Sequence, residues 1–185
     1  MSDLLQDDVD TVFLTMDQMS LYYQATLTEV WAPKGQTPVV RLTPQRDHVH
    51  FYGALDVRGG RQIALSASEQ TSEVTADFIR ILLMLFPSQT LLLLLDRASW
   101  NQGAAVRNIF AENDRLHVIY FPVACPQLNP QEQVWALARE AISHNHDYTD
   151  FDLLVDDFEM YLNENLFECT FMDKYGPPPN STILF

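Results

Sequence analysis

The chain has 185 residues, of which 47% are hydrophobic and 11% aromatic, which excludes the disordered class and fits one main domain with a sizeable core. Its 25 acidic and 11 basic residues give a net charge of −14, which argues against nucleic-acid binding through overall positive charge. The most apolar region, 79–95, is interrupted by Arg80 and by the turn 87–89, so no membrane span is predicted.

The first half of the chain predicts strands separated by turns. Apolar and β-branched runs predict strands at 12–16, 22–31, 48–57 and 62–67. Two prolines and a glycine predict a turn at 32–38, and Gly59 with Gly60 predicts a hairpin turn between the last two strands.

The second half alternates helices with strands. The pattern predicts strands at 90–95 and 116–122, and helices at 71–86, 102–113, 129–144 and 150–167. Strands followed by this alternation predict an α/β protein with a mixed sheet, antiparallel in its first half, to which parallel strands are added through helical crossovers.

Charge is distributed unevenly along the chain. Residues 1–10 hold four acidic residues and no basic one, and residues 147–185 hold nine acidic residues and one basic residue, whereas 11–146 holds twelve and ten. We therefore divide the chain into an acidic N-terminal extension (1–10), a main domain (11–146), an acidic C-terminal helix (147–175) and a proline-rich tail (176–185). The acidic start lacks the features of a signal peptide, so a cytoplasmic protein is expected.

Three acidic residues lie where their side chains are expected to meet. Asp17 and Asp96 each end an apolar run, and Glu132 lies just inside a predicted helix. Ligands of open α/β sheets bind at the carboxyl ends of strands, where both aspartates are expected. A buried carboxylate is unfavourable unless it is compensated, and a divalent cation with oxygen ligands compensates it well. Three carboxylates around Mg²⁺ predict two-metal phosphoryl transfer.

The segments around these three residues resemble one enzyme family. The chain is similar to DDE transposases, in the bacterial insertion-sequence branch of the mariner superfamily, in the segments TMDQ (15–18), WAPKG (31–35), LDRAS (95–99) and LNPQEQVW (128–135). The 35 residues between Asp96 and Glu132 agree with the family's spacing. The resemblance covers roughly residues 11 to 145 and implies an endonuclease of DNA transposition. It also implies a ribonuclease H-like α/β fold, a mixed five-stranded sheet with three antiparallel strands and then two parallel ones, flanked by helices.

The resemblance also implies roles and partners. Asp17, Asp96 and Glu132 map onto the catalytic carboxylates, which would bind two Mg²⁺ or Mn²⁺ ions for DNA strand cleavage and strand transfer. The partners would be DNA, as transposon ends and as target, and a second copy of the chain in a homodimer. Only about ten residues precede the first predicted strand, too few for a helix-turn-helix, so that DNA-reading module is expected upstream or on a separate chain.

Three residues depart from the family's usual pattern. The family usually has Glu at position 18 and Asn at position 97, followed by His a few residues later, whereas this chain has Gln18, Arg97 and Asn101. Arg97 is a candidate phosphate contact, or a counter-charge for Asp96. Further candidate contacts to DNA phosphates are Lys34, Arg41 and Arg46, although a solvated loop explains them equally well.

The acidic residues also have simpler explanations. Asp17 and Asp96 are suited to cap turns after their strands, and Glu132 fits a capping arrangement with Asn129. Trp135 is predicted to be a core residue. His48 and His50 share a strand face but are expected at the surface rather than on a metal, and Cys125 and Cys169 are expected to be reduced thiols.

Two other functions compete with a transposase. One is a related ribonuclease H-like nuclease, which would cut DNA without joining ends. The other is an inactive regulatory remnant that pairs with a full transposase. The C-terminal helix has an apolar stripe of Phe151, Leu154, Phe158 and Leu162, which would either contact such a partner or pack on its own domain.

Overall fold

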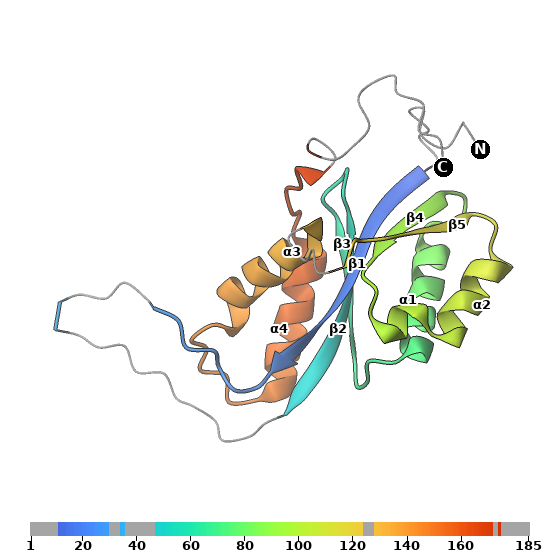
Figure 1. The fold of residues 1–185 in the computed structure, drawn as a ribbon. Helices are drawn as coiled ribbons and strands as arrows, with labels where there is room; N and C mark the ends of the chain where they lie inside the picture. The colour runs from blue at the N-terminus through green and yellow to red at the C-terminus, as the bar shows by residue number, and fades with distance from the viewer. Residues whose placement is uncertain (1–10, 30–33, 36–46, 124–127, 172–173, 175–185) are drawn as a thin grey trace.

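The computed structural model describes residues 11–29, 34–35, 47–123, 128–171 and 174, and a five-stranded sheet forms the middle layer of this part of the chain (Figure 1). The strands are β1 (Thr11–Tyr22), β2 (His48–Asp56), β3 (Gln62–Ala67), β4 (Thr90–Leu95) and β5 (Leu116–Tyr120). They lie in the order β3-β2-β1-β4-β5, in which β1, β2 and β3 pair antiparallel and β4 and β5 pair parallel. The predicted mixed sheet is therefore confirmed.

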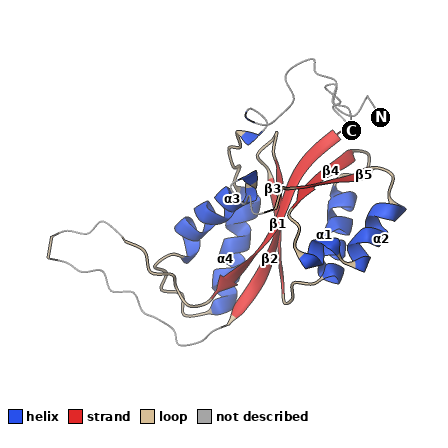
Figure 2. Ribbon diagram, in the orientation of Figure 1, coloured by secondary structure: helices blue, strands red, loops and turns tan. Residues whose placement is uncertain are grey.

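Helices cover both faces of the sheet (Figure 2). They are α1 (Ser72–Leu85), α2 (Ala104–Glu112), α3 (Gln131–Ala138) and α4 (Phe151–Glu164). α1 and α2 pack on one face, and α3 and α4 pack on the other, each pair over its own cluster of buried apolar residues. A 3₁₀ turn, Ser99–Gln102, precedes α2, and a π-helical turn, Arg139–Ser143, extends α3.

Side chains along β1 alternate between the two faces, as in any strand. Met16 belongs to the core under α1 and α2, whereas Met19 belongs to the core under α3 and α4. Asp17 therefore lies on the α3 and α4 face, and Gln18 lies on the α1 and α2 face. Asp17 and Gln18, although adjacent in the sequence, therefore face the helices on opposite sides of the sheet.

The first predicted strand is confirmed but extends further than predicted, and the second predicted strand is wrong. The structure has a single strand, β1, where strands were expected at 12–16 and 22–31, and residues 23–29 add only a bridge between Thr26 and His144. The polar residues from Asp17 onward suggested an early strand end. Asp17 instead lies in the strand interior, because the antiparallel pairing with β2 continues to Tyr22. Residues 30–33, most of the predicted turn at 32–38 and the tail at 176–185 lie outside the described residues.

The chain after α4 returns to the hairpin between β2 and β3. Gly60 has φ +70°, a conformation that favours glycine, so the predicted glycine turn is confirmed. Arg61 forms an antiparallel bridge with Leu166, and the Phe167 N–H donates to the Gly60 carbonyl oxygen at 2.8 Å. A Cβ atom at position 60 would lie 2.6 Å from the Phe167 oxygen, so this close approach also requires glycine.

The apolar stripe of α4 packs on its own sheet. Leu154, Phe158 and Leu162 are fully buried, and the Phe158 ring lies 5.0 Å from the Phe51 ring of β2, between centroids. The Asn163 side chain also bonds both the N–H and the carbonyl oxygen of Ala64 in β3. The stripe is therefore not available to a partner, and the alternative that made it a partner surface is wrong.

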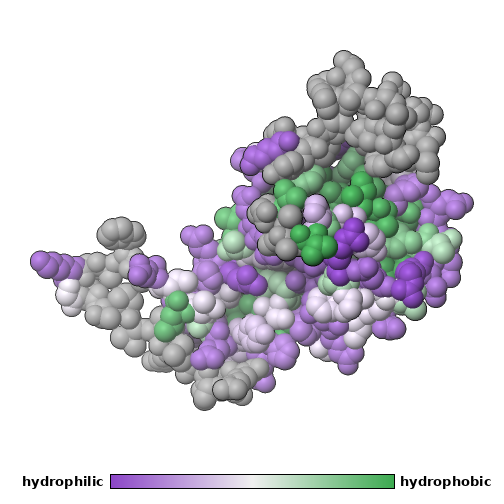
Figure 3. Space-filling model, viewed as in Figure 1, coloured by the Kyte–Doolittle hydropathy of each residue, from purple (hydrophilic) through white to green (hydrophobic). Residues whose placement is uncertain are grey.

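The surface is mostly polar. On the face shown in Figure 3, hydrophilic residues cover most of the outer surface, and hydrophobic residues gather in the upper middle of the view. Among the residues that the structure describes, no helix has the length and apolar character needed to cross a membrane.

Candidate active site

Asp17 is a buried carboxylate in the middle of β1. Its side chain is 9% exposed, and its Oδ2 atom accepts a hydrogen bond from the Trp135 indole N–H of α3 at 3.2 Å. Asp17 pairs across the sheet with Gly53 of β2, where a Cβ atom would overlap the Trp135 ring and the amides of Gln62 and Gln131. The glycine therefore makes the space in which the indole reaches the carboxylate.

The surroundings of Asp17 disfavour its charge. The pKa of this carboxyl is raised to about 7, mainly by burial and in smaller part by the negative charges of Glu132 and Asp96. The Gln18 backbone N–H and the Trp135 indole lower the pKa of Asp17, but together they do not offset the burial. Glu132 and Asp96 therefore both lie within electrostatic reach of Asp17.

Asp96 directly follows the last residue of β4. The parallel register pairs Thr15 with Leu94, so the same register continued by two residues brings Asp96 level with Asp17. Its Oδ1 atom accepts hydrogen bonds from the Ala98 N–H at 3.0 Å and from the Asn101 amide at 2.7 Å. Asp96 thus caps the turn after its strand, as the simpler explanation had it, yet its Oδ2 atom has no hydrogen bond within the described residues.

Glu132 lies in the first turn of α3 and its side chain is exposed. The helix start is capped by Asn129, whose Oδ1 atom accepts from the Gln131 N–H at 3.1 Å. The Glu132 carboxylate makes no hydrogen bond within the described part of the chain, so it does not complete the capping arrangement. It is free to turn toward the two aspartates.

Positive charge is scarce around these carboxylates. The Arg97 N–H donates to the Phe121 carbonyl oxygen at 3.3 Å, and its guanidinium lies 5.4 Å from the Tyr120 ring centroid. Arg97 forms no salt bridge with Asp96, and its counter-charge role stays a prediction. The one salt bridge among the described residues joins Arg80 to Asp77, both on α1.

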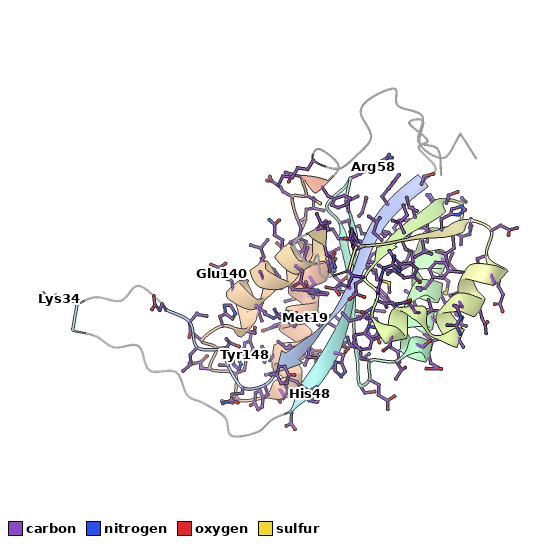
Figure 4. All side chains as sticks on the ribbon, viewed as in Figure 1. Met19, Lys34, His48, Arg58, Glu140 and Tyr148 are labelled. Atoms are coloured by element: carbon purple, nitrogen blue, oxygen red, sulfur yellow. The ribbon has the colours of Figure 1, made fainter. Side chains whose placement is uncertain are left out.

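The other candidate DNA contacts lie elsewhere or are not described. Lys34 is exposed and lies away from the sheet (Figure 4), and Arg41 and Arg46 lie outside the described residues. The role of all four basic residues as DNA contacts stays a prediction.

Histidine and cysteine add no metal site. The His48 and His50 rings lie edge to face, 5.2 Å apart between centroids, and His50 shares a hydrogen bond with Ser20 at 3.0 Å. Cys169 is a half-buried free thiol, and Cys125 lies outside the described residues. Across all described residues, no three His, Cys, Asp or Glu side chains are close enough to hold one ion. This includes the three carboxylates, so a shared ion requires side-chain movement, for which Glu132 is suited.

Sequence reasoning missed the residues that support the aspartates. Trp135 is a core residue as predicted, 1% exposed, but it also donates to Asp17. Gln18 and Asn101, noted only as departures, are hydrogen-bonded to each other at 3.0 Å, and Asn101 also holds Asp96. The one available signal was the helical spacing of Trp135, which follows Glu132 by three residues and therefore shares its side of α3.

Comparisons with known proteins agree with this fold. A family model described as DDE superfamily endonuclease matches residues 12–155. The insertion element IS630 uncharacterized 39 kDa protein of Shigella sonnei is 22% identical over 131 residues, which cover 70% of this chain and 38% of that protein.

Solved structures show the same fold. The Mos1 transposase paired-end complex with left transposon end has a TM-score of 0.65 at 15% identity, over 89% of this chain and 52% of that chain. The mariner Mos1 paired end complex with Mg gives the same TM-score, identity and coverage. The chain thus spans about half the length of this structural relative and 38% of the curated one.

The family match covers most of the chain and includes all three carboxylates. The chain therefore belongs to the DDE superfamily endonucleases.

Proposed function

We propose that this chain cleaves DNA strands and transfers their ends in a metal-dependent reaction, with Asp17, Asp96 and Glu132 as the metal-binding catalytic residues. One observation supports this most. A buried aspartate of β1 lies within electrostatic reach of an exposed glutamate and of a second aspartate, which directly follows the neighbouring strand β4. The described residues offer these carboxylates no salt-bridge partner.

The side chains present fit a hard divalent cation. Mg²⁺ and Mn²⁺ prefer oxygen ligands, and Mg²⁺ needs only a few carboxylates when substrate phosphate and water complete its shell. The unfavourable burial of Asp17 is the kind of electrostatic deficit that a cation corrects. The structural relative described as a complex with Mg supports this choice of ion. We propose two ions, shared by the three carboxylates.

Each supporting residue has a separate task in this proposal. Trp135 orients the Asp17 carboxylate through Oδ2, and the turn after β4 orients Asp96 through Oδ1. Glu132 reaches the site from α3 by rotation of its exposed side chain. When bound, the two ions would supply activation of the attacking water or 3′-hydroxyl and stabilisation of the leaving oxygen. The chain itself mainly positions the reacting groups.

We propose transposon ends and target DNA as the substrates, because a structural relative is described in complex with a transposon end. The proposed phosphate contacts are Lys34, Arg41, Arg46 and Arg97.

A helix-turn-helix module, upstream or on a separate chain, would read the end sequence, and a homodimer would pair two ends. The chain alone should then bind DNA weakly, and we place it in the cytoplasm.

Calorimetry with Mn²⁺ tests the site. We expect Asp96→Asn to weaken Mn²⁺ binding more than about 100-fold, because loss of a direct ligand should exceed the 10–100-fold effect of outer-shell changes. Asp114→Asn is the matched control, since this exposed aspartate lies in the turn before β5 and should leave binding unchanged. Equal affinity of the wild-type and Asp96→Asn proteins would remove the enzymatic proposal and favour the regulatory remnant.

A strand-transfer assay separates the transposase from the rival nuclease. In Mn²⁺ the wild-type chain should nick supercoiled plasmid DNA and join a labelled oligonucleotide 3′ end to it, and Glu132→Gln should do neither. Nicking without joined product would identify a nuclease.

A further inference from the structure

A line of hydrogen bonds connects Asp96 to a tryptophan that does not contact it. The Trp100 indole N–H donates to Gln18 Oε1 at 2.8 Å, and Gln18 Nε2 donates to Asn101 Oδ1 at 3.0 Å. Asn101 Nδ2 then donates to Asp96 Oδ1 at 2.7 Å. Asn101 is fully buried, so its amide has no bulk water as an alternative partner.

The chemistry of the two ends fixes the direction of this line. An indole N–H only donates and a carboxylate only accepts. The Trp100 donor therefore obliges Gln18 to present its oxygen to the indole and its nitrogen to Asn101. Asn101 must in turn present its nitrogen to Asp96. Both amide orientations, which are otherwise interchangeable, follow from their neighbours.

We infer that Gln18, Asn101 and Trp100 are positioning residues that hold Oδ1 of Asp96 and leave its Oδ2 atom facing a metal ion. This inference rests on the proposed function. It also explains why two departures from the family's pattern occur together, because Gln18 and Asn101 bond to each other across the gap between β1 and the 3₁₀ turn. Outer-shell partners of this kind tune metal affinity by fixing ligand orientation.

A double-mutant cycle on Mn²⁺ affinity tests the inference. Asn101→Leu should weaken Mn²⁺ binding about 10–100-fold, as loss of an outer-shell partner does. Gln18→Leu should weaken it less, and the double variant should bind no more weakly than Asn101→Leu, because Gln18 acts only through Asn101. The inference would be overturned if the losses of Mn²⁺ affinity in the two single variants added up in the double variant, or if neither single variant lost affinity. Mn²⁺ binding by the wild-type chain would still leave the proposed function intact.

A conservative replacement and a control sharpen the cycle. A neutral imidazole offers one donor and one acceptor, as the amide does, so Asn101→His should restore most of the affinity that Asn101→Leu loses. Asn108→Leu is the control, because this exposed residue of α2 has the same side chain outside the hydrogen-bond line. Loss of binding in Asn108→Leu equal to that in Asn101→Leu would show a general structural effect and overturn the inference.

If the wild-type chain binds no Mn²⁺, the proposed function is overturned. The positioning role of the hydrogen-bond line can then still be tested without metal. The carboxyl-carbon NMR signal of Asp96 should still move in Gln18→Leu and in Trp100→Phe, although neither side chain touches Asp96. An unmoved signal in both variants would overturn the positioning role.

Discussion

Asp17 lies inside β1 and Asp96 directly follows the neighbouring strand β4, and the protein surrounds the two carboxylates in opposite ways. Asp17 is buried under α3, where the Gln18 backbone N–H and the Trp135 indole do not offset the loss of water, and the pKa of the carboxyl is raised to about 7. Asp96 is half-buried in a turn and receives two donors at 3.0 and 2.7 Å. The Asp17 carboxylate therefore lacks a compensating positive charge, whereas the Asp96 carboxylate is already oriented by its two donors.

The largest expected effect concerns the helix that covers Asp17. Trp135→Ala removes a fully buried ring together with the Asp17 donor, and we expect it to lower the free energy of unfolding by about 3–5 kcal/mol. Trp135→Phe keeps an aromatic ring and removes the N–H, so it should lower this free energy by only about 1–2 kcal/mol. Urea unfolding measures both. Equal losses in the two variants would show that the hydrogen bond, and not the packing, dominates.

A pH series separates the two aspartates. The raised pKa of Asp17 means that the native protein binds more protons than the unfolded chain between pH 3.8 and about 7, so wild-type stability falls as pH rises across this range. Without metal, the free energy of unfolding of Asp17→Asn should therefore equal that of the wild type near pH 4. Above pH 7 it should exceed that of the wild type by of the order of 2–4 kcal/mol. Thermal unfolding at several pH values measures this.

Asp96→Asn provides the contrast in the same series. Its carboxylate already has two donors, one of them the Asn101 amide, so an amide at position 96 brings no comparable gain above pH 7. If Asp17→Asn and Asp96→Asn gained equally, the comparison between the two aspartates would fail.

A smaller effect is expected opposite Asp17. Gly53→Ala would place a methyl group where the Trp135 ring lies, and we expect the overpacking to lower the free energy of unfolding by about 1–3 kcal/mol. The displaced indole should also change its fluorescence. Gly59→Ala is a suitable control, because a Cβ atom there would meet only the Asp56 side chain. A Gly53→Ala protein as stable as the wild type would show that the indole has room to move.

Most of the fold was predictable because its signals are local. Continuous apolar runs identified β4, the Gly59-Gly60 turn identified the β2–β3 hairpin, and Thr71 identified the start of α1, where its hydroxyl accepts the Val74 N–H at 3.2 Å. The extent of β1 was not predictable, because the polar residues that seemed to end it are satisfied by partners distant in sequence.

The candidate site was predictable in identity but not in geometry. The spacing of Asp96 and Glu132 and the block around them pointed to the correct family. The contacts of Asp17 with Trp135 and of Gln18 with Asn101 join residues 118 and 83 positions apart, which no local pattern indicates. The assignment of the three carboxylates as metal ligands stays a prediction until binding is measured.

The hydrogen bond between Phe167 and Gly60 ties the chain after α4 to the β2–β3 hairpin, so it limits how far the C-terminal end of the polypeptide can be shortened. The stretch matched by the family ends at residue 155, inside α4, so an expression clone trimmed to that boundary would lose Phe158 and Leu162. The side chains of Phe51 and its neighbours on the sheet would then face water, and aggregation would follow during purification. A clone that continues past residue 167 retains the whole of this cover.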